Sequence, residues 1–400
     1  MQNKLYESRE DIQAAAIATW VSTKRGTLVL STGVGKTYVA IVIACGQIKK
    51  KLINSCLIVV PTINLISQWE KEILKWGYSL EGITIKCLQT AYKEESEYDL
   101  LVVDEIHTAT AEKYSSVFVN TKHKQCLGLS ATVDSENEII KTHCPVIFTI
   151  EVADALAAKA FNNYTVYNVA VSLNRKEQAI YNTFDRQFKL AKLQLLILKK
   201  EYPDYADLTI FDIAKKHSNS KEKDELTKWS KTFWSAMTMR KSICYKAYTK
   251  AEAAKQLIAT SPTSKWIIFT MSIDLAKQLS AEIPNSVVYH SKQKDDVRVQ
   301  ILKDYSDNKS SCLIAVQALN AGMNIPDIDK AICISGNSSE LDAIQRLGRI
   351  ARVKDTPSIF INLYSKNTIE KTWLENRNKK IDNVVWQDFT IMKQLLCPKS

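Results

Sequence analysis

A glycine-rich turn between an apolar strand and an apolar helix is the feature that most limits what this chain can fold into. The apolar run TLVL at 27–30 leads into the loop STGVGKT at 31–37, and the apolar segment 38–48 follows. Backbone N–H groups in such a loop turn toward phosphate oxygens, and the positive end of the following helix adds to the attraction. The sequence therefore predicts a phosphate-binding loop within a parallel α/β sheet.

The residue types in this loop fit the parts of a bound nucleoside triphosphate. Lys36 is placed to reach the β- and γ-phosphates, and the hydroxyl of Thr37 can ligate Mg²⁺. The full pattern is not met, because Ser31 or Thr32 stands where its first glycine would be. A plain Gly-Lys-Thr turn is therefore the alternative interpretation. The predicted loop contacts are Thr32, Gly33, Val34, Gly35, Lys36 and Thr37.

A second signal is the apolar run YDLLVVDE at 98–105, which ends in two carboxylates. At the carboxyl end of a parallel strand, Asp104 can hold the water shell of Mg²⁺, and Glu105 can polarise the attacking water. A strand-end Asp-Glu pair alone is equally typical of a helix cap. Together with the upstream phosphate loop, it predicts a site for ATP hydrolysis.

Short apolar runs recur in two series, which predicts two parallel α/β sheets. Strands buried on both faces form nearly continuous apolar runs separated by helical crossovers. A chain of 400 residues is long enough for two or three domains. We place the domains at 1–155 and 156–400. The runs lie at 27–32, 56–62, 98–105 and 125–132, and then at 265–270, 286–290, 312–317, 330–336 and 358–364.

The net charge of +11 is concentrated in the middle of the chain. Residues 1–155 carry a net charge of −2, residues 156–264 of +9 and residues 265–400 of +4. We predict a basic helical insertion at about 186–259, where Gly and Pro are scarce, with an exposed turn at 217–225. Either nucleic acid binding or Lys-rich solvated helix faces would explain the excess.

Cysteine usage and hydropathy indicate a cytoplasmic protein. The nine cysteines are an odd number without a CxxC pair, which favours reduced core thiols over disulfides or zinc ligands. No apolar run approaches the roughly 20 residues of a bilayer crossing. The start MQNKLYESRED is too acidic for a signal peptide. We expect a monomer without a membrane partner.

Six motifs in order resemble those of the superfamily 2 helicases. They are GVGKT, VVPTINLISQW, VVDEIH, GLSATV, VQALNAGMNIP and QRLGRIAR, and they span about residues 8–352. The chain is most similar to compact phage DNA helicases and to repair and restriction-type translocases. This resemblance implies two RecA-like domains in tandem, ATP and Mg²⁺ as cofactors, and a nucleic-acid partner. The partner is expected to be single-stranded or branched, with DNA favoured over RNA.

The resemblance also implies roles for individual residues of the ATP site. Arg9 and Gln13 would contact adenine, while Gly322 and Asn324 would contact ribose and the nucleic-acid backbone. Asn324 departs from the family, where an Asp is frequent at that position. The predicted catalytic residues are Lys36, Asp104, Glu105, Gln345, Arg349 and Arg352, of which the last two would act as arginine fingers.

Two further groups of residues have predicted roles away from the phosphates. The residues that couple the ATP site to domain movement would be His107, Ser130, Thr132 and Arg346. The nucleic-acid contacts would be Pro61, Thr62, Gln68, Thr90, Thr270, His290, Lys228, Lys231, Arg240 and Lys241. Other basic candidates in the insertion are Lys215, Lys216 and Lys246, among the aromatic residues Trp229, Phe233 and Trp234.

The sequence leaves more than one function open. The first is an ATP-dependent helicase or translocase that moves along or unwinds a strand. The alternatives are an ATPase that remodels or anneals branched DNA or RNA without net unwinding, and an RNA helicase. A P-loop kinase would not account for QRLGRIAR at 345–352.

Overall fold

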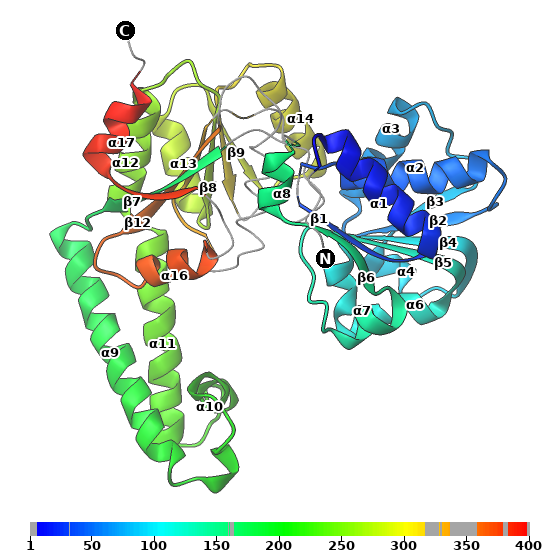
Figure 1. Cartoon of the computed structure of the whole chain (residues 1–400). Coiled ribbons are helices and arrows are strands. Elements are labelled where there is room, and N and C mark those ends of the chain that lie inside the picture. Colours follow the sequence, from blue (N-terminus) through cyan, green and yellow to red (C-terminus); the bar gives the residue numbers. More distant parts are fainter. Residues whose placement is uncertain are drawn as a thin grey trace.

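The computed structural model describes residues 6–31, 33–158, 160, 164–316, 328, 330–336, 358–378 and 383–397. These residues form two parallel sheets, one in each lobe, and a long helical hairpin that extends from the second lobe (Figure 1). The strand order is β3-β2-β4-β5-β1-β6 in the first sheet and β13-β7-β12-β11-β8-β10-β9 in the second. The predicted architecture of two parallel α/β sheets is confirmed.

The first sheet brings its two predicted chemical signals to one edge. Its strands β1 and β4 both pair with β5 in parallel, so the loop after β1 and the carboxylates after β4 lie at the same carboxyl edge. The strands are β1 (Arg25–Leu30), β2 (Cys56–Val60), β3 (Ile83–Cys87), β4 (Ser96–Asp104), β5 (Thr121–Ser130) and β6 (Val146–Ile150). The helices are α1 (Arg9–Thr23), α2 (Lys36–Lys49), α3 (Asn64–Lys75), α4 (Leu88–Ala91), η1 (Ile106–Thr110), α5 (Glu112–Ser115), α6 (Val117–Asn120), α7 (Glu138–His143) and α8 (Val152–Ala157).

The second sheet is built on the same plan, with fully buried central strands. Every residue of β8 and β10 is buried, as expected for parallel strands covered on both faces. The strands are β7 (Tyr164–Val171), β8 (Trp266–Thr270), β9 (Ser286–His290), β10 (Cys312–Val316), β11 (Lys330–Cys333), β12 (Ser358–Ser365) and β13 (Val384–Asp388). The described helices around it are α12 (Tyr248–Ala259), α13 (Ile273–Glu282), α14 (Asp295–Ser306), α16 (Glu370–Arg377) and α17 (Phe389–Leu396).

The hairpin consists of α9 (Arg175–Lys199) and α11 (Glu225–Tyr245), with η2 (Pro203–Tyr205) and α10 (Ile210–His217) at its far end (Figure 1). At 1.5 Å per residue, α9 is about 37 Å long. Its start is fixed by a capping box between Asn174 and Glu177, and Asp224 caps α11. A small core of its own, which includes Leu195, Ile213 and Phe233, holds the two helices together.

The hairpin differs from the predicted insertion in its bounds. It begins at Arg175 rather than near 186, because the capping box starts a helix directly after β7. It ends at Tyr245 rather than near 259, because α12 packs into the core of the second lobe through Ala254 and Leu257. The predicted domain boundary at 155 falls within α8, and β7 already belongs to the second sheet.

The cysteines lie mainly in the two cores. None of the nine, all of which are among the described residues, forms a disulfide, and eight are buried, with Cys397 exposed, as predicted for core thiols. In the part of the chain that the structure describes, no helix has both the length and the hydropathy to cross a bilayer.

Candidate functional site

The loop after β1 has the backbone of an anion cradle. Gly33 and Gly35 both have φ of 99°, a left-handed conformation that favours glycine. Gly35 caps α2 without any side-chain hydrogen bond, so the first N–H groups of this helix are left for a ligand. A Cβ at Gly35 would also lie 2.5 Å from Nε2 of Gln13. The described part of the loop therefore has the backbone conformation that a phosphate-binding loop requires.

Two carboxylates lie beside this loop at the end of β4. Asp104 and Glu105 are each only 9% exposed, and Nζ of Lys36 lies 3.7 Å from Oε1 of Glu105. Glu105 has φ of 48°, which is rare for a residue other than glycine and is typical of functional turns. The N–H and hydroxyl of Thr108 both donate to the carbonyl of Glu105, at 2.8 and 2.9 Å, and hold this turn.

The electrostatics of the carboxylate pair favour a bound cation. Burial and the neighbouring charge of Glu105 raise the pKa of Asp104 to about 7, against the opposing effects of Lys36 and of the hydrogen bond from Trp69. Two buried carboxylates thus share one lysine. A divalent cation at Asp104 and Thr37 would supply the missing positive charge, so the residues present fit Mg²⁺.

The predicted coupling residues form a continuous network with Glu105. Nδ1 of His107 lies 2.9 Å from Oγ of Ser130, and both atoms lie 3.5 Å from Oε2 of Glu105. The hydroxyl of Ser130 also contacts the backbone of Thr132. Burial lowers the pKa of His107 below its usual value. The network links the end of β4 to the end of β5.

The two residues predicted to contact adenine lie on α1. Nε2 of Gln13 donates to the carbonyl of Val34 in the phosphate loop at 2.7 Å, so this nitrogen braces the loop. Arg9 is in the first turn of α1, with its guanidinium 3.4 Å from Glu10. Their contacts with adenine stay predictions.

Seven predicted site residues lie outside the described residues, and their roles stay predictions. They are Thr32, Gly322, Asn324, Gln345, Arg346, Arg349 and Arg352.

The predicted nucleic-acid contacts of the first lobe lie at the same edge of the sheet. Pro61 and Thr62 follow β2, and Thr90 is exposed on α4 after β3. Gln68 is half-buried on α3. Its neighbour Trp69 is core, at 1% exposure, and its Nε1 donates to Oδ2 of Asp104 at 3.2 Å. This brace on the carboxylate was not predicted, because nothing in the sequence pairs positions 69 and 104.

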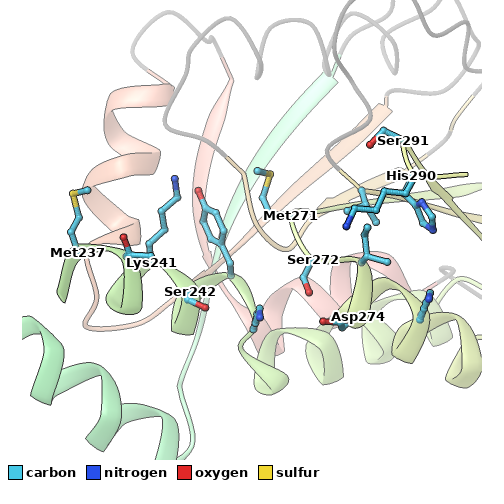
Figure 2. Close-up of a pocket in the computed structure, with 15 residues that line it drawn as sticks. Met237, Lys241, Ser242, Met271, Ser272, Asp274, His290 and Ser291 are labelled. Atoms are coloured by element: carbon cyan, nitrogen blue, oxygen red, sulfur yellow. The ribbon is translucent and has the colours of Figure 1, made fainter. Parts of the chain in front are cut away.

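A pocket of about 990 Å³ opens at the carboxyl edge of the second sheet. In Figure 2, Met237, Lys241 and Ser242 line it from α11, facing Met271 and Ser272 after β8. Its other lining residues include His290 at the end of β9, Ser291 and Lys292 after that strand, and Asp274, Lys277, Tyr245 and Lys246. Four lysines against one aspartate make it basic, and the lining of Met and Tyr is apolar enough for nucleobases.

Two predicted contacts at this edge have different outcomes. His290 lines the pocket, and its Nδ1 is buried without a hydrogen-bond partner among the described residues. Thr270 is only 2% exposed, and its hydroxyl contacts Ser335 and accepts from the N–H of Ser272. We correct the prediction for Thr270, because its side chain is buried and Met271 and Ser272 line the pocket instead.

The basic residues of the hairpin divide by helix face. Lys228, Lys231 and Lys241 are exposed on α11. Arg240 is buried, with Nη1 2.7 Å from Asp185 and its guanidinium 3.9 Å from the ring of Phe188. The prediction that Arg240 contacts nucleic acid is therefore corrected.

The faces of α11 explain this division. Position 240 shares a helix face with the buried residues Phe233, Ala236 and Cys244. That spacing was the signal in the sequence that could have identified Arg240 as a core residue. Lys228 and Lys231 lie about 15–20 Å farther along α11 than Lys241, toward the tip of the hairpin.

These sites define a class of protein. A phosphate loop and a buried acidic pair in one lobe, with a basic pocket at the carboxyl edge of the sheet in the other, are the features of a two-lobed nucleotide hydrolase that acts on an anionic chain.

Comparison with known families and relatives narrows the class. The family described as "Type III restriction enzyme, res subunit" matches residues 6–85 and 81–135, and "Helicase conserved C-terminal domain" matches residues 249–354. The chain is 29% identical to a DNA 3'-5' translocase, XPB2, of Sulfurisphaera tokodaii, over 90% of this chain and 82% of the relative. It is 24% identical to the XPB subunit of the TFIIH helicase/translocase of Trypanosoma brucei brucei, of which it spans 39%.

Solved structures support the same fold. The chain resembles Dbp5 of S. cerevisiae bound to RNA and ADP BeF3, with a TM-score of 0.64 at 12% identity, over 96% of this chain and 92% of that one. It also resembles the helicase domain of Hef from Pyrococcus furiosus, with a TM-score of 0.55 at 18% identity, over 92% and 97% of the two chains. The predicted tandem RecA-like fold is confirmed.

The chain belongs to superfamily 2 of the helicases and is an ATP-hydrolysing enzyme. The match to a restriction-enzyme helicase family agrees with the predicted resemblance to restriction-type translocases.

Proposed function

We propose that this helicase is a DNA translocase that couples ATP hydrolysis between its lobes to movement along one strand. The observation that carries the proposal is the basic pocket at the carboxyl edge of the second sheet. The predicted ATP site lies at the carboxyl edge of the first sheet, which we call the ATP edge. The name of the archaeal relative, a DNA translocase, supports DNA as the partner.

At the ATP edge, each residue has a distinct task. Lys36 and the N–H groups at the start of α2 bind the phosphates, and Glu105 polarises the attacking water. Asp104 and Thr37 would hold Mg²⁺, which stabilises phosphate charge when it is bound. The predicted fingers Arg349 and Arg352 would come from the second lobe, so the rate of hydrolysis would depend on how the lobes are arranged.

The DNA strand would lie across both lobes, at the carboxyl edges of their sheets. Thr62 and Thr90 would contact its phosphates in the first lobe. Lys241 and His290 would contact it in the second, where Met237 and Met271 lie beside the bases. A change in the distance between the two grips during each ATP cycle would move the enzyme along the strand.

Two assays test this proposal together. Binding competition among single-stranded, duplex and forked DNA and matched RNA should show tightest binding to single-stranded or forked DNA. ATP-driven movement should displace a streptavidin block or an annealed strand from that DNA. ATPase activity that responds to DNA without any displacement would favour a remodelling enzyme, and preferred binding to RNA would refute the DNA assignment.

A further inference from the structure

Three consecutive residues at the exit of β11 are held by hydrogen bonds from different parts of the second lobe. The carbonyl of Ile334 accepts from Nζ of Lys250 at 2.7 Å. The hydroxyl of Ser335 accepts from the N–H of Met271 at 2.9 Å. The carbonyl of Gly336 accepts from the hydroxyl of Tyr245 at 3.0 Å. We call residues 334–336 the exit turn.

Two of these three partners are walls of the basic pocket. Tyr245 ends α11 and lines the pocket, with Nζ of Lys241 5.2 Å from the centre of its ring. Met271 lines the pocket from the end of β8. The two residues that hold Ser335 and Gly336 therefore both face the space that a ligand of the pocket would occupy.

The third partner is a fixed anchor. Lys250 is fully buried, and its Nζ lies 2.8 and 2.9 Å from the two carboxylate oxygens of Glu370. The N–H of Ser365 donates to Glu370 at 2.7 Å, so the buried pair is well satisfied. A buried pair with this many partners holds its geometry, because breaking it would leave an uncompensated charge. Ile334 is thus fixed, while the two residues after it are held by the pocket walls.

We propose that the exit turn transmits occupancy of the pocket to the ATP site, with Tyr245 as a positioning residue. This inference rests on the proposed function, because it takes a DNA strand as the ligand of the pocket. The segment with the predicted fingers Arg349 and Arg352 follows Gly336 directly in the sequence. A strand against the ring of Tyr245 would shift the hydroxyl that holds Gly336, which is the last described residue before these arginines in the sequence.

The substitution Tyr245→Phe tests this link with the loss of a single atom. It keeps the ring in the pocket and beside Lys241, and it removes the hydrogen bond to Gly336. We expect kcat of the DNA-stimulated ATPase to fall about fivefold, which is the effect of one hydrogen bond of roughly 1 kcal/mol. The Kd for single-stranded DNA should stay within about twofold of wild type, because the apolar contact and the lysines remain.

The substitution Tyr181→Phe is the matched control. The hydroxyl of Tyr181, on α9, accepts from the N–H of Ile369 at 2.8 Å, so it also joins the hairpin to the second lobe, but its bond is to the residue before α16 and not to residues 334–336. This variant should keep the stimulated kcat of wild type. The thermal unfolding temperature of each variant should be measured as well, and a value close to that of wild type would show that the variant is folded. A second test is Ser335→Ala, which removes the acceptor for Met271 and should lower the stimulated kcat in the same direction.

The outcomes separate this inference from the proposed function. Full stimulation of Tyr245→Phe by DNA would overturn the inference alone. An equal loss in Tyr181→Phe would also overturn it, because the effect would then come from general loosening of the hairpin. A wild-type enzyme that neither binds DNA nor responds to it would refute the proposed function, and the inference with it.

Discussion

The carboxyl edges of the two sheets carry charge in opposite ways. At the edge of the first sheet, Asp104 and Glu105 are buried next to Lys36. At the edge of the second, Lys241 and Lys292 are exposed around an open pocket. The two sheets have the same parallel plan, so the fold does not set this difference. Buried charges need specific partners, so their positions are fixed, as catalysis requires. Exposed lysines instead attract a long anion such as a nucleic-acid strand through their electrostatic potential.

The same contrast separates two neighbours on α11. Arg240 is buried against Asp185, and Lys241 is exposed in the pocket. Each contributes one positive charge to the basic middle of the chain, yet only Lys241 is free to meet a phosphate. Burial, rather than net charge, decides which basic residues can bind DNA.

The substitution Glu105→Gln tests the buried edge and should have the largest effect. It keeps the shape of the side chain but removes the base, so ATP turnover should fall roughly 10²- to 10⁴-fold. Binding of ATP should persist in a fluorescence titration with a labelled nucleotide. Glu97→Gln, at the exposed amino end of the same strand, is the control. A normal rate in Glu105→Gln would remove Glu105 from the mechanism.

The substitution Asp185→Asn tests the buried charge of the hairpin. It leaves the guanidinium of Arg240 without its countercharge, which should destabilise the hairpin by on the order of 2–3 kcal/mol, given that Asp185 is partly exposed. Hydrogen exchange in α9 and α11 should accelerate accordingly. Asp204→Asn, at the exposed tip, should have no such effect. Unchanged exchange in Asp185→Asn would show that the pair is not needed for stability.

The same pair predicts a pH dependence. Burial opposes ionisation of Asp185, but hydrogen bonds from Lys189 and Arg240 outweigh it and lower its pKa. The stabilisation is therefore present above the unfolded pKa of about 3.9 and is lost as the pH falls through the lower folded value. The wild-type hairpin should lose stability in this acid range, and Asp185→Asn should lack that step. An acid step of the same size in both proteins would assign it to other carboxylates.

Neutralising exposed lysines tests the open edge. The triple change of Lys228, Lys231 and Lys241 to Gln should lower the slope of log Kd for DNA against log salt by about 0.7–0.9 for each lost phosphate contact. Lys49, Lys50 and Lys51, at the end of α2 away from the ATP edge, provide a control with the same change in charge. If the slope does not move, the lysines of α11 form a solvated face.

The smallest effect is expected at the coupling network. Ser130→Ala removes the hydroxyl that contacts His107 and Thr132, and ATP turnover should fall about two- to fivefold, which is the loss typical of one neutral hydrogen bond. Ser115→Ala removes a hydroxyl bond of similar kind at the surface of α5 and should leave turnover unchanged. Equal turnover in Ser130→Ala and wild type would show that the network does not contribute to the rate.

Much of the fold could be predicted because buried parallel strands leave a local pattern. The runs at 56–60 and 98–104 are apolar over most of their length, and both form central strands. Strands β3, β6 and β13 were not predicted, since each lies at the edge of its sheet and is only partly buried. Strand β7, inside the second sheet, was not predicted either. The phosphate loop and the acidic pair were predicted for a similar reason, because each is a short contiguous motif.

Contacts between distant positions could not be predicted. Lys250 stands in a run of lysines and alanines, and nothing in its neighbourhood shows that it is fully buried against Glu370. The contacts of Trp69 with Asp104 and of Tyr245 with Gly336 likewise depend on how the sheets bring distant segments together. A single sequence does not show which distant residue each side chain will contact in the folded protein.

The central claim is that occupancy of the open, basic edge controls chemistry at the buried, acidic edge. It is tested most directly by the steady-state ATPase rate of the full chain, measured with and without saturating single-stranded DNA. We predict that DNA increases kcat by about tenfold or more, as expected when a ligand improves transition-state stabilisation by roughly 1.4 kcal/mol. A kcat that does not change when DNA is bound would contradict the account.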